Sequence, residues 1–159
     1  MIALYAGSFD PPHRGHVELV RRAAAVSTRL IVGVAANPAK TPFLPAEVRV
    51  ALLRAACADL ANLSVEIYTG ATVVFARARN VQVLIRGLRT AVDAEFERGL
   101  AAINRQAAGI ETLLLLADGA HSHLSSSLVR EAARAGLPLD ALVAPDVAAA
   151  IHKQLAAKS

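Results

Sequence analysis

The feature that most constrains the fold is a regular alternation of short apolar runs with longer helical patterns. The apolar runs cover five segments: Ile2–Ala6, Leu30–Ala36, Leu63–Ile67, Val81–Ile85 and Thr112–Leu116. Helical spacing of apolar residues occurs near 15–26, 45–58, 71–79, 92–107, 125–135 and 145–157. Alternating strands and helices are typical of a parallel sheet with right-handed crossovers. The sequence therefore predicts an α/β fold, a Rossmann-like, doubly wound five-stranded parallel sheet with helices on both faces.

Length and composition favour a single domain over residues 1–159, with the helix near 145–157 packed on it. The chain has 159 residues and a mass of 16.6 kDa, which suits one hydrophobic core. Hydrophobic residues make up 55% of it and aromatic residues only 4%. This composition suits helices packed on a parallel sheet, and it does not supply the stacking surface that binds single-stranded nucleic acid.

The charge pattern favours a small phosphorylated ligand. The net charge is +4, and the 17 basic residues are mostly arginine. Arginine is preferred where a planar, bidentate contact to phosphate is needed. The arginines are spread singly and alternate with acidic residues such as Asp93 and Glu97. We therefore expect no nucleic-acid partner, although nucleic-acid binding is the competing interpretation of the charge.

The single cysteine and the N-terminal segment predict a cytoplasmic protein. Cys57 lies in an Ala- and Leu-rich helical pattern, which is typical of a buried structural thiol, and one cysteine excludes a disulfide within the chain. Residues 1–5 lack the basic region of a signal peptide. No apolar stretch reaches the roughly 18 residues that a membrane span requires, so no membrane association is expected.

The segment from Gly7 to His16 predicts a phosphate site. It reads Gly-Ser-Phe-Asp-Pro-Pro-His-Arg-Gly-His and joins the first apolar run to the first helical pattern. At such a turn the free N–H groups and the positive end of the helix dipole face an anion. Gly7 and Gly15 allow close approach of backbone to phosphate, and His13 and His16, three residues apart, point the same way.

Five polar segments follow the five predicted strands. They are Ser8–His16, Asn37–Pro42, Gly70–Val73, Arg86–Arg89 and Asp118–Ser127. In open α/β sheets, ligands bind outside the carboxyl ends of the strands, so we expect these segments to meet at one edge. Gly87 is expected to form a tight turn between the two arginines. One of the serines 125–127 is expected to cap the helix that follows.

Three motifs occur in the order that one group of enzymes shares. They are His13-Arg14-Gly15-His16 at a helix start, Ile85-Arg86-Gly87-Leu88-Arg89, and Ser125-Ser126-Ser127-Leu128-Val129-Arg130-Glu131. With them the chain resembles the nucleotidyltransferases that carry a (T/H)xGH motif, and among these the bacterial phosphopantetheine adenylyltransferases, from Ala3 to about Leu155. That family transfers the adenylyl group of ATP to 4′-phosphopantetheine, giving dephospho-coenzyme A and pyrophosphate in coenzyme A biosynthesis. The resemblance implies the same activity here.

The resemblance also implies a set of catalytic residues: His16, Lys40, Ser8 and Arg89. His16 would donate to the α-phosphate, Ser8 would orient the attacking phosphate or the nucleotide, Lys40 would reach between the two substrates, and Arg89 would clamp the ATP phosphates. A direct in-line attack needs no protein nucleophile, so positioning and charge neutralisation carry the catalysis. The alternatives are a capping or exposed histidine, a solvated loop lysine and a surface salt bridge.

The binding residues implied by the resemblance fall into two groups. The phosphopantetheine group is Ser8, Lys40, Thr72, Val73, Arg86 and Asn104. The ATP group is Ser8, Phe9, His16, Arg89, Glu97, Ser125, Ser126 and Ser127. Glu97 matches a residue associated with the ribose, and the serine run matches residues that contact the triphosphate. Several of these residues are equally suited to solvated or core positions on a helix.

Departures from the family pattern concern the histidines. His13 stands where the family more often has threonine, and would add a donor beside His16. His121 stands where an aromatic residue commonly lies beside adenine. His121 and His123 lack a third ligand at suitable spacing, so no protein metal site is expected. Mg²⁺ is the expected cofactor, held mainly by the ATP phosphates and water.

The family resemblance further implies a homohexamer and coenzyme A as a feedback ligand. Two other functions stay open. One is a nucleotidyltransferase acting on a pyridine mononucleotide or on glycerol phosphate, since such enzymes share the His-x-Gly-His turn. The other is a nucleotide-binding module without catalysis, which would bind ATP but release no pyrophosphate.

Overall fold

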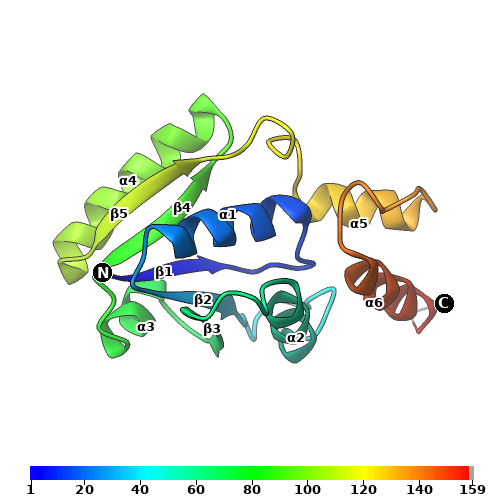
Figure 1. The fold of residues 1–159 in the computed structure, drawn as a ribbon, viewed down its shortest axis with the longest axis horizontal. Helices are drawn as coiled ribbons and strands as arrows, with labels where there is room; N and C mark the ends of the chain where they lie inside the picture. The colour runs from blue at the N-terminus through cyan, green and yellow to red at the C-terminus, as the bar shows by residue number, and fades with distance from the viewer. Residues whose placement is uncertain (158–159) are drawn as a thin grey trace.

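A computed structural model describes residues 1–157 and contains a five-stranded parallel sheet (Figure 1). The strands are β1 (Ile2–Gly7), β2 (Arg29–Ala35), β3 (Leu63–Tyr68), β4 (Val83–Leu88) and β5 (Glu111–Leu116). Their order is β3-β2-β1-β4-β5, and every pairing is parallel. The chain moves outward from β1 to β3, then returns to the other side of β1 with β4. This reversal is the doubly wound topology that the sequence predicts.

Helices cover both faces of the sheet. They are α1 (Arg14–Ala25), α2 (Ala46–Ala56), α3 (Thr72–Ala78), α4 (Ala91–Ala108), α5 (Ser126–Arg134) and α6 (Pro145–Ala156). One apolar cluster joins the sheet to α1 and α2, with Val20 and Leu53 at its centre and the thiol of Cys57 buried in it, as predicted. A second cluster joins the opposite face to α3 and includes Phe75. Successive residues of each buried strand point alternately into these two clusters. Because both faces of the strand are covered, the strand is apolar throughout.

A third apolar cluster lies beyond the carboxyl ends of the strands. Val129 of α5 and Ile151 of α6 pack there with Leu44, from the segment before α2, and all three are almost fully buried. In Figure 1, α5 and α6 project to one side of the sheet, at the end where β1 finishes. Within the described residues, no helix is both long and apolar enough to cross a membrane.

The fourth strand differs from its predicted bounds. It runs from Val83 to Leu88 rather than from Val81 to Ile85, because Gly87 pairs with Leu115 and Leu88 with Leu116 of β5. The expected tight turn at Gly87 is therefore wrong. A Cβ at this position would lie 2.6 Å from Cδ1 of Leu19, so a larger residue there would require the end of the Leu19 side chain to shift.

Candidate active site

The turn between β1 and α1 holds aromatic rings in close contact. Phe9 is buried and has a φ of +50°, a left-handed conformation that is uncommon for a bulky residue. Its ring meets the ring of His16 edge-on, with centroids 4.9 Å apart. The ring of His13 stacks on His16 with centroids 3.5 Å apart. His16 is thus fixed by ring contacts with Phe9 and His13.

A backbone hydrogen bond determines which nitrogen of His16 carries its proton. The N–H of His13 donates to Nδ1 of His16 at 3.2 Å. In a neutral imidazole the other nitrogen, Nε2, must then be the donor. Burial, and next the nearby His13 and Arg89, hold the pKa of His16 well below 6.5. At neutral pH the side chain is a neutral N–H donor.

His13 is the more deeply buried of the two histidines, with 7% of its surface exposed. Burial first, then the charges of Arg89 and His121, lower its pKa to about 4. Its Nδ1 and that of His121 are buried without a hydrogen-bond partner in the described structure. Both histidines line the same cavity as His16, whereas His123 is exposed and lines none of the cavities described below.

This His16 cavity, of about 270 Å³, brings together residues from every motif. Its lining includes Ser8, Phe9, His13, His16, Arg86, Arg89, Glu97, His121, Ser125 and Ser126. Two arginines enter it already paired with carboxylates. Arg86 donates to both oxygens of Glu97, at 2.8 to 3.0 Å, and to the Ala6 carbonyl. Arg89 donates to Asp93 at 3.3 Å. The bidentate Arg86–Glu97 pair fixes the direction of the Arg86 guanidinium.

A second cavity, the Asn104 cavity, adjoins the first on the α3 and α4 face of the sheet. It has a volume of about 310 Å³, and Thr72, Val73 and Asn104 line it. Ala6, Arg86 and Glu97 line both cavities. The Arg86–Glu97 pair therefore forms part of the boundary between them.

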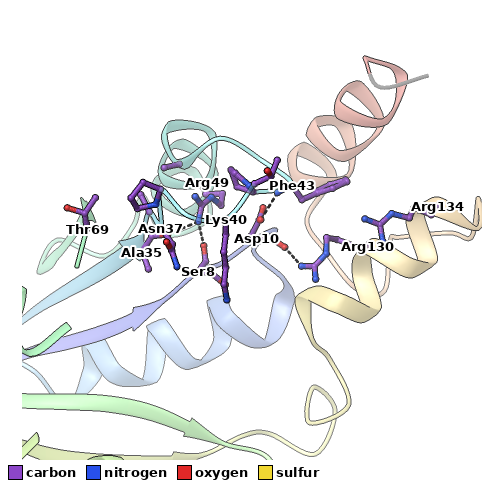
Figure 2. Close-up of a pocket in the computed structure, with 15 residues that line it drawn as sticks. Ser8, Asp10, Ala35, Asn37, Lys40, Phe43, Arg49, Thr69, Arg130 and Arg134 are labelled. Carbon is purple, nitrogen blue, oxygen red and sulfur yellow. Dashed lines mark hydrogen bonds between the residues drawn. The ribbon is translucent and has the colours of Figure 1, made fainter. Parts of the chain in front are cut away.

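Lys40 lies in a third and larger cavity. This Lys40 cavity measures about 730 Å³ and is lined by the end of β2, the following loop, and α5. Ser8 lines both it and the His16 cavity. Figure 2 shows the Lys40 side chain extending from its loop past Ser8. Among the residues predicted for the site, Ser8 thus connects the lysine side with the histidine side.

The three serines before and in α5 have separate contacts. Ser125 is the N-cap and accepts from the N–H of Leu128 at 3.1 Å, as expected for one of the three. The Ser126 hydroxyl donates to the Pro11 carbonyl at 2.9 Å. Ser127 is exposed, lies outside the three cavities, and accepts from Arg130 at 3.0 Å. The structure brings Ser125 and Ser126, but not Ser127, to the His16 cavity.

Sequence reasoning missed three residues at this edge. Tyr5 lines the His16 cavity, and burial raises its pKa to about 12, so its phenol stays protonated. Asp10 belongs to the predicted turn, but nothing in the sequence indicates what its carboxylate binds. Arg49 is 3% exposed and lines the Lys40 cavity. Its position four residues before Leu53, on the buried face of α2, was the available signal.

The fold, the cavity and the (T/H)xGH turn together define a nucleotidyltransferase. The family described as Cytidylyltransferase-like matches residues 4–132 of this chain. A crystal structure from Vibrio parahaemolyticus, described as a nicotinate-nucleotide adenylyltransferase, has a TM-score of 0.69 and covers 96% of this chain and 91% of its own. At 16% identity, that likeness supports the fold alone.

Sequence relatives narrow this class further. A phosphopantetheine adenylyltransferase from Synechococcus sp. (strain JA-3-3Ab) is 44% identical and covers 93% of this chain and 94% of its own length. Relatives of the same name from Latilactobacillus sakei and Nocardioides sp. are 45% and 40% identical, covering 97% and 98% of this chain and 94% and 98% of their own. The chain therefore belongs to the phosphopantetheine adenylyltransferase family, as the sequence motifs predicted.

Proposed function

We propose that this enzyme transfers the adenylyl group of ATP to 4′-phosphopantetheine, giving dephospho-coenzyme A and pyrophosphate. The observation that carries the proposal is the adjacency of two cavities that share Arg86 and Glu97 in their linings, with His16 and Arg89 in one and Asn104 in the other. Two polyanionic substrates need adjacent sites with cations at the junction. Membership of the family supports the same activity.

On the nucleotide side, His16 donates its Nε2–H to the α-phosphate as negative charge develops there. Two properties of His16 support this role. Its Nδ1 already accepts a hydrogen bond, and its low pKa keeps the imidazole ring neutral. Arg89, Ser125 and Ser126 would contact the phosphates at the start of α5, where free N–H groups favour an anion. Phe9 and Glu97 would contact the nucleoside.

On the acceptor side, the Asn104 cavity would hold the pantetheine arm against Thr72 and Val73. The acceptor phosphate would lie near Ser8 and Arg86, within reach of Lys40. Its oxygen attacks the α-phosphorus in line with the departing pyrophosphate, and no covalent enzyme intermediate forms. The ammonium of Lys40 would follow the charge that moves between the substrates.

Magnesium fits this site as an ion that enters with ATP. Within residues 1–157, no three His, Cys, Asp or Glu side chains are placed to hold a metal ion. The nearby carboxylates of Glu97 and Asp93 are engaged by arginines. Mg²⁺ commonly keeps several waters and binds through substrate phosphates, where it neutralises charge. We assign the protein no direct ligand to it.

Assembly as a homohexamer is part of the proposal. Three apolar side chains of α4, Val92, Phe96 and Ile103, are 60 to 80% exposed, and Leu116 of the neighbouring β5 is 64% exposed. Apolar surface of this kind marks a protein interface. Light scattering should give six subunits, and Phe96→Glu should give a smaller species. We further propose coenzyme A as a feedback ligand, because it contains the product, and a cytoplasmic location, where ATP and phosphopantetheine are available.

The deciding experiment is pyrophosphate release with ATP and 4′-phosphopantetheine, with nicotinate mononucleotide and glycerol phosphate as parallel acceptors. We expect turnover only with phosphopantetheine. Turnover with another acceptor would assign a different nucleotidyltransferase activity. ATP binding without release of pyrophosphate from ATP in the presence of any of these acceptors would make the protein a nucleotide-binding module.

A further inference from the structure

A single buried guanidinium contacts both ends of the loop that carries Lys40. This Lys40 loop, residues 36–42, joins β2 to the segment before α2. Arg49 donates from Nη1 to the carbonyl of Ala35, just before the loop, at 3.1 Å, and from Nε to the carbonyl of Leu44, just after it, at 3.0 Å. Its Nη1 also donates to the carbonyl of Ser8 at 2.5 Å. One side chain thus connects the loop to the β1–α1 turn (Figure 2).

Asp10 holds the end of the loop from the opposite side. Its two carboxylate oxygens accept from the backbone N–H groups of Phe43 and Leu44, each at 2.7 Å. The carbonyl of Asp10 accepts from Arg130 of α5 at 2.6 Å. Charge-assisted bonds of this kind are roughly twice as strong as neutral ones. Leu44 is therefore held through its carbonyl by Arg49 and through its N–H by Asp10.

Between these anchored ends the loop is short and has its own turn. The side-chain oxygen of Asn37 accepts from the N–H of Ala39 at 2.9 Å, and the N–H of Lys40 donates to the Asn37 carbonyl at 3.1 Å. Lys40 itself is exposed. Its backbone position is consequently set by the internal turn and by the two anchored ends.

We propose that Arg49 and Asp10 form a clamp that positions Lys40 relative to Ser8, and that both are positioning residues for the adenylyl transfer. This inference rests on the proposed function, because only the proposed adenylyl transfer gives the position of Lys40 a catalytic consequence. A buried guanidinium is costly unless its donors are satisfied. Arg49 donates to carbonyls of the β1–α1 turn and of the segments that flank the Lys40 loop, so the same bonds that offset its burial also fix the geometry of the site.

The main test compares Arg49→Met with Arg54→Met, alone and in a Lys40→Ala background. Arg54 lies on the same helix and donates to the Val65 carbonyl, away from the loop, so its replacement removes a similar bond. We expect Arg49→Met to lower kcat by about five- to tenfold, no more than the loss of Lys40 itself, with little change in KM for ATP, because a misplaced catalytic group loses most of its effect. Arg54→Met should leave kcat unchanged.

The Lys40→Ala background distinguishes an effect of Arg49 that acts through Lys40 from a structural effect on the rest of the site. If Arg49 acts through Lys40, Arg49→Met should lower kcat less than about twofold further once Lys40 is absent. If the kcat loss of the double variant equals the product of the losses of Arg49→Met and Lys40→Ala, the clamp is overturned. A rise in KM for ATP with kcat unchanged would overturn it as well.

Asp10→Asn supplies a second test in case Arg49→Met does not fold. Asparagine keeps one acceptor but turns an NH₂ group toward the second backbone N–H, so one of the two bonds is lost at nearly constant volume. We expect the same kcat loss and the same dependence on Lys40. A kcat within about twofold of the parent would contradict the inference, because a 1 Å shift is far more costly.

Hydrogen exchange tests the clamp without reference to the reaction. In the free parent protein the amides of Phe43 and Leu44 should be protected, and Asp10→Asn should speed their exchange at least about tenfold. Unchanged exchange would overturn the clamp. If the parent enzyme releases no pyrophosphate while exchange changes as expected, the proposed function fails and the clamp geometry stands.

Discussion

The cationic side chains on the two sides of the β1–α1 turn differ in whether they form ion pairs. On the side of the His16 cavity, Arg86 and Arg89 are paired with Glu97 and Asp93. On the other side, the structure of residues 1–157 contains no ion pair of Lys40, which is exposed on its loop. The difference teaches that the charges of the His16 cavity are organised before any ligand arrives, whereas the charge of Lys40 is left for a ligand to neutralise.

Replacing His16 should have the largest effect, because it removes the most rigidly held donor. We expect His16→Ala to fold normally and to lose about 10²–10³ in kcat, the usual cost of one donor aimed at developing charge. His152→Ala, at an exposed position of α6, is the matched control. Single-turnover measurement of pyrophosphate release checks the effect, and a variant within about threefold of the parent would remove His16 from the mechanism.

Acid should destabilise the nucleotide side through His13. Its folded pKa of about 4 lies below the ordinary 6.5, so between these pH values the unfolded chain binds more protons. Stability is fully present above pH 6.5 and is lost as pH falls through 4, by on the order of 3 kcal/mol for this residue. In urea unfolding between pH 7 and 4, His13→Gln should reduce the dependence of the free energy of unfolding on pH, and His152→Gln should not. Equal slopes in all three proteins would contradict the prediction.

Arg89→Ala tests whether the paired arginines serve the nucleotide. A charged hydrogen bond contributes about 1.5–3 kcal/mol, so ATP affinity measured by calorimetry should fall roughly 10- to 150-fold. Arg79→Ala is the control, because Arg79 is also an exposed arginine in an ion pair but lies outside the three cavities. If phosphopantetheine binding alone weakened, the roles of Arg86 and Arg89 would have to be exchanged.

Lys40→Ala should have the smallest of these effects, since a solvent-exposed ammonium contributes less than a buried donor. We expect kcat and kcat/KM to fall together, by about tenfold, as for an interaction made mainly in the transition state. Steady-state kinetics with each substrate varied in turn measures both. A tenfold rise in KM for phosphopantetheine at constant kcat would instead make Lys40 a binding residue.

Most of the sheet was predictable because buried parallel strands are apolar throughout. The predicted end of β4 was wrong because the strand continues through Arg86 and Gly87, a charged residue and a glycine that ordinarily indicate a loop. Packing favours glycine at that position, since a Cβ would displace the end of the Leu19 side chain. Likewise, the motif identified His16, but the hydrogen bonds between Asp10 and Leu44 and between Arg49 and Ser8 join residues more than 30 positions apart, and local sequence patterns do not encode such partners.

The third apolar cluster packs the C-terminal helix against the segment that follows the Lys40 loop. Leu44, whose N–H and carbonyl are held by Asp10 and Arg49, has its side chain in the same cluster as Val147 and Ile151 of α6. The family match at residues 4–132 ends before this helix. Substitutions that weaken the packing of α6 would therefore weaken the packing of Leu44 at the end of the Lys40 loop. Changes in α6, far from the bound phosphates, could in this way alter kcat.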